Sequence, residues 1–154
     1  MAIPKNFEIF QTSSPFIGSI GPLYHCEDQG GFVLGLQVQA QHCNTGGRLH
    51  GAMVCAIADI ALGRNIGLDI YRRSSAAERE AQAVNGIGLV TTGLSVDFVG
   101  TARVGQWVET QVDVQRTGRS MGFANAYLVC DDQRIARASG VFKILRDQVA
   151  PASR

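Results

Sequence analysis

The chain has 154 residues, of which 45% are hydrophobic and 18% are charged, and its net charge at pH 7 is +1. This length suits one domain with a buried core, and the composition excludes an intrinsically disordered chain. The near-neutral charge gives no overall attraction to nucleic acid or to an anionic membrane surface, so we expect neither as a partner.

The targeting features and the cysteines both favour the cytoplasm. The first ten residues lack a basic segment followed by an apolar one, so we expect no secretory signal. The apolar run at 52–62 is too short to span a bilayer. The four cysteines form no C-x-x-C pair, which is typical of free thiols in a reducing compartment.

The N-terminal third is predicted to hold two strands. Residues 1–15 form a lead-in, as a short helix or a loop. Strand-like segments follow at 17–27 and 32–40, separated by the turn sequence Asp28-Gln-Gly-Gly31. Residues 42–50 are rich in Gly, Asn and Thr and are predicted to form a loop.

The middle of the chain predicts one long helix over 51–71. Between 52 and 62 this helix is apolar on almost every side, which indicates burial on all sides. The polar segment at 72–88 is predicted to continue as helix over 74–81 before a glycine-containing loop.

The last third predicts a meander of four strands, at 92–101, 107–116, 121–130 and 134–145. Two strands, a long helix and four antiparallel strands make an α+β pattern, in which a curved sheet wraps around the helix. One sheet covers only part of a helix that is apolar all round. We therefore expect a second copy of the chain to cover the remainder.

The start of the long helix holds the strongest candidate site. Backbone N–H groups in the first turn of a helix lack internal acceptors, and Gly51 carries no side chain that would obstruct a ligand. A substrate carbonyl could therefore accept a hydrogen bond from the Gly51 N–H, which would stabilise the oxyanion that forms during the reaction. Asp59 is the only Asp, Glu, Lys, Arg or His between Gly51 and Gly63. A carboxylate in an apolar helix is costly unless it is paired or functional, which suits a general base or nucleophile.

Gly51 and Asp59 are separated by eight residues, or about 12 Å along a helix. One carbonyl cannot contact both residues in one chain. If both serve one reaction, they come from different subunits related by a two-fold axis. The alternative is structural, with Asp59 paired to Arg64 one turn later.

A wider set of residues resembles the hotdog thioesterase superfamily, in the branch of phenylacetate-degradation-type and mammalian acyl-CoA thioesterases. The resemblance covers about residues 18–145 of one domain spanning 1–154, and its motifs are His42-x-Asn44-x2-Gly47-x-Leu49-His50-Gly51, Asp59, and Gly93-Leu-Ser95-Val-Asp97. It implies the hotdog fold and hydrolysis of an acyl-CoA with an aryl or a short to medium acyl group. It also implies a homo-oligomer, either a dimer or a dimer of dimers.

The resemblance assigns roles residue by residue. The Gly51 N–H polarises the thioester carbonyl, and Asp59 of the partner subunit attacks it or activates water. Asn44 orients the substrate or the water, and Ser95 positions the water. His50 lies beside the substrate, although we expect it mainly to hold the loop and the helix start.

The resemblance also implies a coenzyme A site near the hairpin before the penultimate strand and the end of the helix, at Arg119, Ser120, Arg72 and Arg73. Coenzyme A enters as part of the substrate, and no separate cofactor is expected. No metal is expected either, because His42 and His50 lack a ligand partner at a familiar spacing. Two departures from the family are Ala52, where a second glycine is usual, and the longer 72–88 segment, which could lengthen the helix or form a lip over the acyl pocket.

Three other interpretations concern the same chain. Residues 118–122 match G-x-S-x-G, but they lie in a predicted hairpin with no later histidine, so a nucleophile elbow is rejected. A hotdog hydratase or dehydratase would carry an Asp-x4-His motif, which this chain lacks. A non-catalytic acyl-CoA-binding or sensing module remains open, although mere binding does not require a carboxylate such as Asp59.

Overall fold

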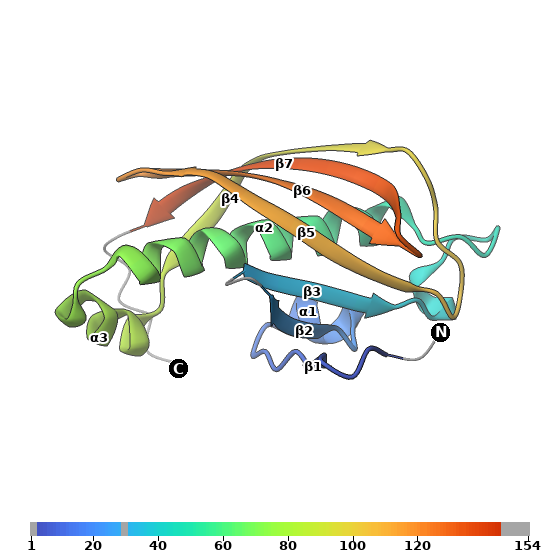
Figure 1. Cartoon of the computed structure of the whole chain (residues 1–154), viewed down its shortest axis with the longest axis horizontal. Helices are drawn as coiled ribbons and strands as arrows, with labels where there is room; N and C mark the ends of the chain where they lie inside the picture. Colours follow the sequence, from blue (N-terminus) through green and yellow to red (C-terminus); the bar gives the residue numbers. More distant parts are fainter. Residues whose placement is uncertain (1–2, 29–30, 146–154) are drawn as a thin grey trace.

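The computed structural model describes residues 3–28 and 31–145, and Figure 1 shows a curved sheet wrapped around one long helix. In chain order the elements are β1 (Glu8–Ile9), α1 (Pro15–Ile20), β2 (Tyr24–Asp28), β3 (Gly31–Gln37), the 3-10 turn η1 (Ala40–His42), α2 (Gly51–Arg73), α3 (Ala76–Asn85), β4 (Gly88–Phe98), β5 (Trp107–Thr117), β6 (Met121–Cys130) and β7 (Gln133–Leu145). The predicted α+β architecture, an antiparallel sheet around a central helix, is confirmed.

The seven strands lie in the order β1-β2-β3-β5-β6-β7-β4, and all neighbours are antiparallel. Only β5, β6 and β7 form the predicted meander. The prediction is wrong for β4, which pairs with β7 and forms the edge of the sheet. Asp131 and Asp132 join β6 to β7 with φ of 50° and 60°, the left-handed turn that matches the twist of a tight hairpin.

The predicted strand at 17–27 is wrong in its first half, where the chain forms α1. Ser14 caps this helix by accepting a hydrogen bond from the Ile17 N–H, and Pro15 takes the first helical position, where its missing N–H costs nothing. Strand β2 therefore begins only at Tyr24. Strand β3 also ends at Gln37, three residues earlier than expected, because η1 follows.

The long helix is confirmed, and within the single chain the sheet covers only part of it, as expected. One face packs against the sheet, through Met53, Val54, Ile57, Ala58, Ala61, Leu62, Asn65 and Ile66. The stripe that includes Asp59, Ile60, Gly63 and Gly67 is only partly covered. By length and composition alone α2 could cross a membrane. In this fold its buried residues belong to the hydrophobic core that the helix forms with the sheet.

Two glycines let α2 lie close to the sheet. A Cβ at Gly122 on β6 would come within 2.7 Å of the Ile66 side chain, and a Cβ at Gly140 on β7 would meet Leu62 at 3.0 Å. These contacts also define the inner face of the sheet. Gly140 faces α2, and so does the β4 residue opposite it in the register, Leu94.

The helix does not continue through 74–81 as predicted. Ser74 ends α2, and Ser75 starts the separate helix α3 with a capping box, in which its hydroxyl accepts from the Glu78 N–H and the Glu78 carboxylate accepts from the Ser75 N–H. Gly86 ends α3 with φ of 72°, a conformation that glycine adopts without strain. Figure 1 shows α3 folded back beneath the C-terminal end of α2.

Candidate active site

The start of α2 presents a free backbone donor. His50 is the N-cap residue, and its Nδ1 accepts a hydrogen bond from the Ala52 N–H at 3.0 Å. The His50 carbonyl accepts from Met53 and Val54. Among the residues that the structure describes, none accepts from the Gly51 N–H. That group is therefore available to a ligand oxygen, as an oxyanion donor must be.

A small cavity of about 230 Å³ lies beside this donor. It is lined by Gly51 and by residues of the helix start, the end of β4 and the following loop, including Val54, Phe98 and Thr101. The Phe98 ring lies 3.4 Å from the point where a Cβ on Gly51 would stand. Any side chain at position 51 would therefore contact this ring and occupy the approach to the N–H.

Asp59 lies on the partly covered stripe of α2 and faces β4. Its Oδ1 accepts a hydrogen bond of 2.7 Å from the Thr91 hydroxyl. No ion pair among the described residues involves Asp59. The alternative partner, Arg64, stacks instead over the Phe10 ring, 4.8 Å from its centroid. Asp59 is thus oriented by a neutral hydroxyl, and one carboxylate oxygen stays free of any described partner.

The Asp59 carboxylate lies at the wall of the large cavity of the fold, which has a volume of about 740 Å³. Helix α2, α3, the N-terminal segment and strands β2, β3 and β4 all contribute to it, and Thr91 lines it together with Asp59. A cavity of this size is ample for a small-molecule ligand. The carboxylate is therefore accessible to a substrate.

Gly51 and Asp59 line different cavities. They lie about 12 Å apart along the axis of α2, as the spacing predicted. A single chain does not bring them together, and a site shared between subunits stays a prediction.

Asn44 lies in the loop before α2. Its Oδ1 accepts from the Gly46 N–H at 2.9 Å and from the Arg48 N–H at 3.2 Å. These bonds fold the loop back so that the His50 N–H can reach the His42 carbonyl. Asn44 thus holds the loop that presents Gly51, and its contact with a substrate stays a prediction.

Ser95 lies on the outer face of the sheet, away from α2. Its register partner is Ser139, whereas the flanking Leu94 and Val96 pair with Gly140 and the buried Ala138. The structure therefore does not bring Ser95 to Asp59 within one chain. Thr91, which the sequence reasoning missed, occupies the position beside the carboxylate. Thr91 lies one residue before the strand predicted at 92–101, and no pattern in the sequence marks it as a site residue.

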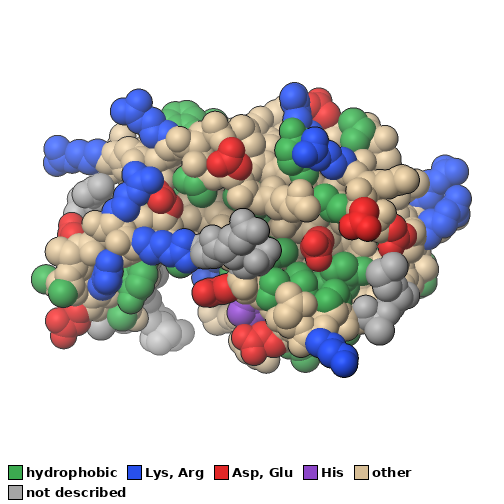
Figure 2. All heavy atoms as spheres, viewed as in Figure 1, with side chains coloured by type: hydrophobic (Ala, Val, Ile, Leu, Met, Phe, Trp, Pro, Cys, Tyr) green, Lys and Arg blue, Asp and Glu red, His purple; other side chains and the backbone are tan. Residues whose placement is uncertain are grey.

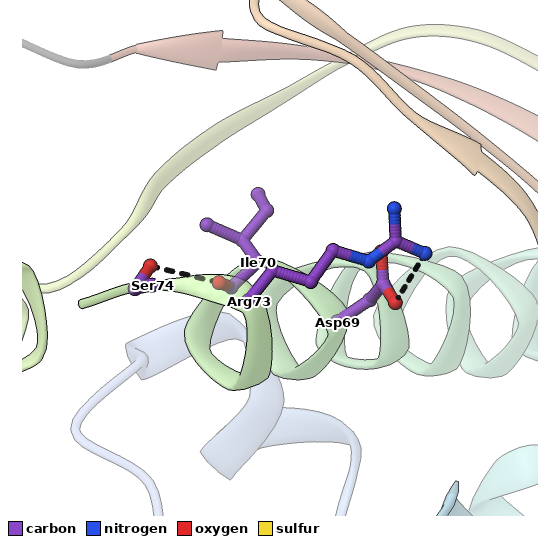
Figure 3. A network of polar contacts seen from close by, with 4 residues as sticks. All are labelled: Asp69, Ile70, Arg73 and Ser74. Atoms are coloured by element: carbon purple, nitrogen blue, oxygen red, sulfur yellow. Dashed lines mark hydrogen bonds and ion pairs between the residues drawn. The ribbon is translucent and has the colours of Figure 1, made fainter.

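The predicted coenzyme A residues lie toward the opposite end of α2 from Gly51. Figure 1 shows the β5–β6 hairpin, which carries Arg119 and Ser120, at the same end as the C terminus of α2. Figure 2 shows Lys and Arg side chains gathered over that end. Arg73 is engaged by Asp69 in an ion pair of 3.0 Å (Figure 3). The Arg72 side chain is exposed, while its carbonyl accepts from Arg79.

His42 is buried beneath the loop, and its Nδ1 accepts from the Gln39 N–H at 3.0 Å. Desolvation lowers the pKa of His42, and this outweighs the opposite effect of the backbone groups of Gly21 and Ile20. The histidine is therefore a neutral structural residue. Among the described residues, no group of three His, Cys, Asp or Glu side chains is arranged to hold a metal ion.

Comparison with known proteins agrees with this architecture. The thioesterase superfamily model matches residues 46–136, which include Gly51, Asp59 and Thr91. A Pseudomonas aeruginosa protein named a "putative esterase" is 36% identical over 145 residues, covering 94% of this chain and 98% of that protein. The chain belongs to the thioesterase superfamily. Membership supports hydrolase activity in general.

Solved structures of thioesterase superfamily proteins share the fold, and the hotdog architecture is confirmed. Zebrafish thioesterase superfamily member 2 superposes with a TM-score of 0.70 at 22% identity, covering 86% of this chain and 89% of that one. The E. coli PaaI protein from the phenylacetic acid degradation operon gives 0.69 at 18% identity and covers 86% of each chain. A Bacillus halodurans protein solved with CoA gives 0.70 at 18% identity, covering 90% and 83%.

Proposed function

We propose that this superfamily member hydrolyses acyl-CoA thioesters and that Asp59 is its general base or nucleophile. One observation carries the proposal. A carboxylate free of any described cation lies at the wall of a cavity of about 740 Å³ and is oriented by the Thr91 hydroxyl. A carboxylate placed in this way can accept a proton from water or attack a carbonyl carbon.

The reaction adds the elements of water across the C–S bond. The nucleophile attacks the thioester carbonyl, and its oxygen becomes an oxyanion held by the Gly51 N–H of the partner subunit. The intermediate then collapses and the C–S bond breaks. If Asp59 is the general base, the thiolate of coenzyme A takes up the proton that Asp59 removed from the attacking water. If Asp59 is the nucleophile, water then hydrolyses the mixed anhydride and supplies that proton. The free acid and coenzyme A leave. The Thr91 hydroxyl orients the carboxylate. The resemblance implied a different role for Ser95, that of positioning the water.

Coenzyme A is the proposed carrier of the acyl group. The Bacillus halodurans neighbour was solved with CoA, and the chain carries basic residues at the α2 C terminus and at the β5–β6 hairpin. We propose that Arg72, Arg119 and Ser120 contact the nucleotide part. Arg73 could do so only by leaving Asp69.

The proposed enzyme is a homodimer or a dimer of dimers in the cytoplasm. The partly covered stripe of α2 and the inner residues of the edge strand β4 are both accessible in the single chain, and a second chain placed against them would cover both. Antiparallel α2 helices would then bring Gly51 of one subunit toward Asp59 of the other. Within one helix the two residues are too far apart to contact one substrate carbonyl.

The decisive test is the variant Asp59→Asn, which keeps the size of the side chain and its hydrogen bond to Thr91. We expect kcat for acyl-CoA hydrolysis, followed by release of free thiol, to fall by at least about a hundredfold. The thermal transition should stay close to that of the wild type. Near-normal turnover would exclude Asp59 as the reacting group. If the wild type binds acyl-CoA without hydrolysis, the chain is a binding module instead.

A further inference from the structure

Two arginines lie directly opposite each other beside the start of α2. Arg48, in the loop before the helix, and Arg103, in the loop between β4 and β5, form an isolated antiparallel β-bridge. Their neighbours Leu49 and Ala102 are buried, and the Leu49 N–H donates to the Ala102 carbonyl at 2.8 Å. Because side chains alternate along an extended chain, both arginine side chains point to the solvent side, with Cβ atoms about 5 Å apart. The backbone therefore holds two guanidinium groups on the same face.

Neither guanidinium has a hydrogen bond, an ion pair or a ring contact with the described part of the chain. Asp131, the carboxylate that Gln106 links to the Arg103 N–H, forms no ion pair with either of them. By contrast, Arg137 on β7 donates to Asp97 Oδ2 at 2.7 Å. Like charges directly opposite each other repel, and an anion bound between them removes this repulsion. Phosphate suits the pair best, because guanidinium N–H groups match its oxygens bidentately.

The arginine pair borders the proposed oxyanion site. Leu49 and Ala102, the residues next to the two arginines, line the cavity of about 230 Å³ that Gly51 also lines. Arg48 precedes Gly51 by three positions, so their Cα atoms lie at most about 11 Å apart. Figure 1 shows this loop projecting beyond the N terminus of α2, and Figure 2 shows Lys and Arg side chains at that end of the molecule. A ligand with its carbonyl oxygen at the Gly51 N–H therefore has its remote end within reach of the pair.

We propose that Arg48 and Arg103 form a phosphate-binding site, and that they hold the diphosphate of coenzyme A while the thioester lies at Gly51. The inference rests on the proposed acyl-CoA hydrolysis. Coenzyme A carries its diphosphate nearer to the sulfur and its 3′-phosphate on the ribose beyond, so this pair and the basic residues at the C-terminal end of α2 bind different groups. The contact with the diphosphate is the same in the ground state and in the transition state, so it lowers KM and leaves kcat unchanged.

The test is the double variant Arg48→Gln/Arg103→Gln, assayed with acyl-CoA, acyl-dephospho-CoA and acyl-pantetheine that carry the same acyl group. The first two have the diphosphate, and only acyl-CoA has the 3′-phosphate. KM should rise by at least roughly tenfold for the first two, while kcat stays within about twofold of wild type. Both constants should keep their wild-type values for acyl-pantetheine. An unchanged KM for acyl-CoA, an increase confined to acyl-CoA, or one shared by acyl-pantetheine, would overturn the inference.

Two further variants control for net charge and for the loss of an arginine. Arg137→Gln removes an exposed arginine from the outer face of the sheet and should keep the wild-type KM for all three thioesters. Arg48→Lys/Arg103→Lys should recover part of the lost affinity, because lysine keeps the charge but does not bind phosphate oxygens bidentately. An equal increase of KM in Arg137→Gln would reduce the effect to net charge and overturn the site.

Binding separates this inference from the proposed reaction. Coenzyme A, pantetheine and inorganic phosphate are titrated by calorimetry into wild type and Arg48→Gln/Arg103→Gln. The Kd of coenzyme A should rise by at least roughly tenfold in the variant, and that of pantetheine should not change. If this difference appears while no acyl-CoA is hydrolysed, the phosphate site stands and the hydrolysis fails. If hydrolysis occurs with the same Kd and KM in both proteins, the phosphate site fails. Weaker binding of inorganic phosphate alone would assign the pair to free phosphate and overturn the inference.

Discussion

Thr91 and Ser95 stand four positions apart on β4 and yet face opposite sides of the sheet. Regular alternation would place residues 91, 93 and 95 on one face. The register with β7 shifts between Thr91 and Gly93, where a bulge adds one residue and inverts the alternation that follows. Because of this bulge, the Thr91 hydroxyl faces α2 and donates a hydrogen bond to Asp59, whereas Ser95 points to the outer face of the sheet.

The variant Thr91→Val should therefore lower kcat by about ten- to a hundredfold, because the carboxylate loses the donor that orients it. Ser95→Ala is the control and should stay within about twofold of wild type. Steady-state kinetics of thiol release from an acyl-CoA measure both. A large loss in Ser95→Ala with little loss in Thr91→Val would reverse this assignment.

His50 shows how a residue beside the reacting groups can act through backbone geometry. Its Nδ1 caps the Ala52 N–H. His50→Ala should lower the free energy of unfolding by about 1 kcal/mol, and His50→Asn should restore most of it, since asparagine is a good N-cap. Urea denaturation measures both variants. Equal stability of His50→Ala and wild type would show that the cap contributes nothing.

At the scale of elements, strong periodicity and turn chemistry were enough to predict α2, β3, β5, β6 and β7. The misses have local physical causes. Ser14 and Ser75 cap the starts of α1 and α3. Apolar content had favoured a strand at the first, and the polar segment at the second was expected to continue the long helix. The position of β4 depends on pairing with β7, some 45 residues later in the chain, which no local pattern reports. Asp59 and Gly51 could be predicted as site residues because each is chemically exceptional in its segment. Thr91 differs from other strand residues only through its hydrogen bond to Asp59, which the sequence does not show.

The buried His42 at the end of η1 predicts that the free energy of unfolding depends on pH. The pKa of His42 is lowered from 6.5 by burial, so the unfolded chain binds a proton at a higher pH than the folded one does. Well above pH 6.5 the residue is neutral in both states and its contribution is complete. As the pH falls below 6.5, the unfolded state is protonated first and the free energy of unfolding decreases.

Urea denaturation between pH 7.5 and pH 5, in wild type and His42→Asn, measures this effect. The other described histidines, His25 and His50, are common to both proteins, so the difference between the two curves isolates His42. We expect the wild type to lose more stability than the variant as the pH falls. Parallel curves would contradict a neutral, buried His42.

At the scale of the whole molecule, the exposed inner face of β4 predicts how the subunits meet. Leu94 and Phe98 face the α2 side of the sheet and are 37% and 55% exposed in the single chain. Apolar side chains on an edge strand favour association with another copy. The Phe98 ring also lies against Gly51, so this surface borders the proposed oxyanion site.

Leu94→Glu should therefore convert the proposed oligomer to monomers and abolish acyl-CoA hydrolysis together, because the proposed site combines Gly51 and Asp59 from different subunits. Ser95→Glu places the same charge on the outer face and should leave a dimer that hydrolyses its substrate. Analytical ultracentrifugation and thiol release at the same concentrations measure the two properties. A fully active Leu94→Glu monomer would refute the shared site.

The place of β4 outside β7 has a consequence for synthesis of the protein. The strand that carries Thr91 leaves the ribosome well before β7, its hydrogen-bonding neighbour, and it can join the sheet only when residues up to 145 have emerged. Until then the nascent chain exposes an unpaired β-edge and the apolar stripe of α2, which makes it a client for chaperones. Release of a chain that ends before β7 should yield an aggregation-prone fragment in which the hydroxyl of Thr91 never reaches its carboxylate.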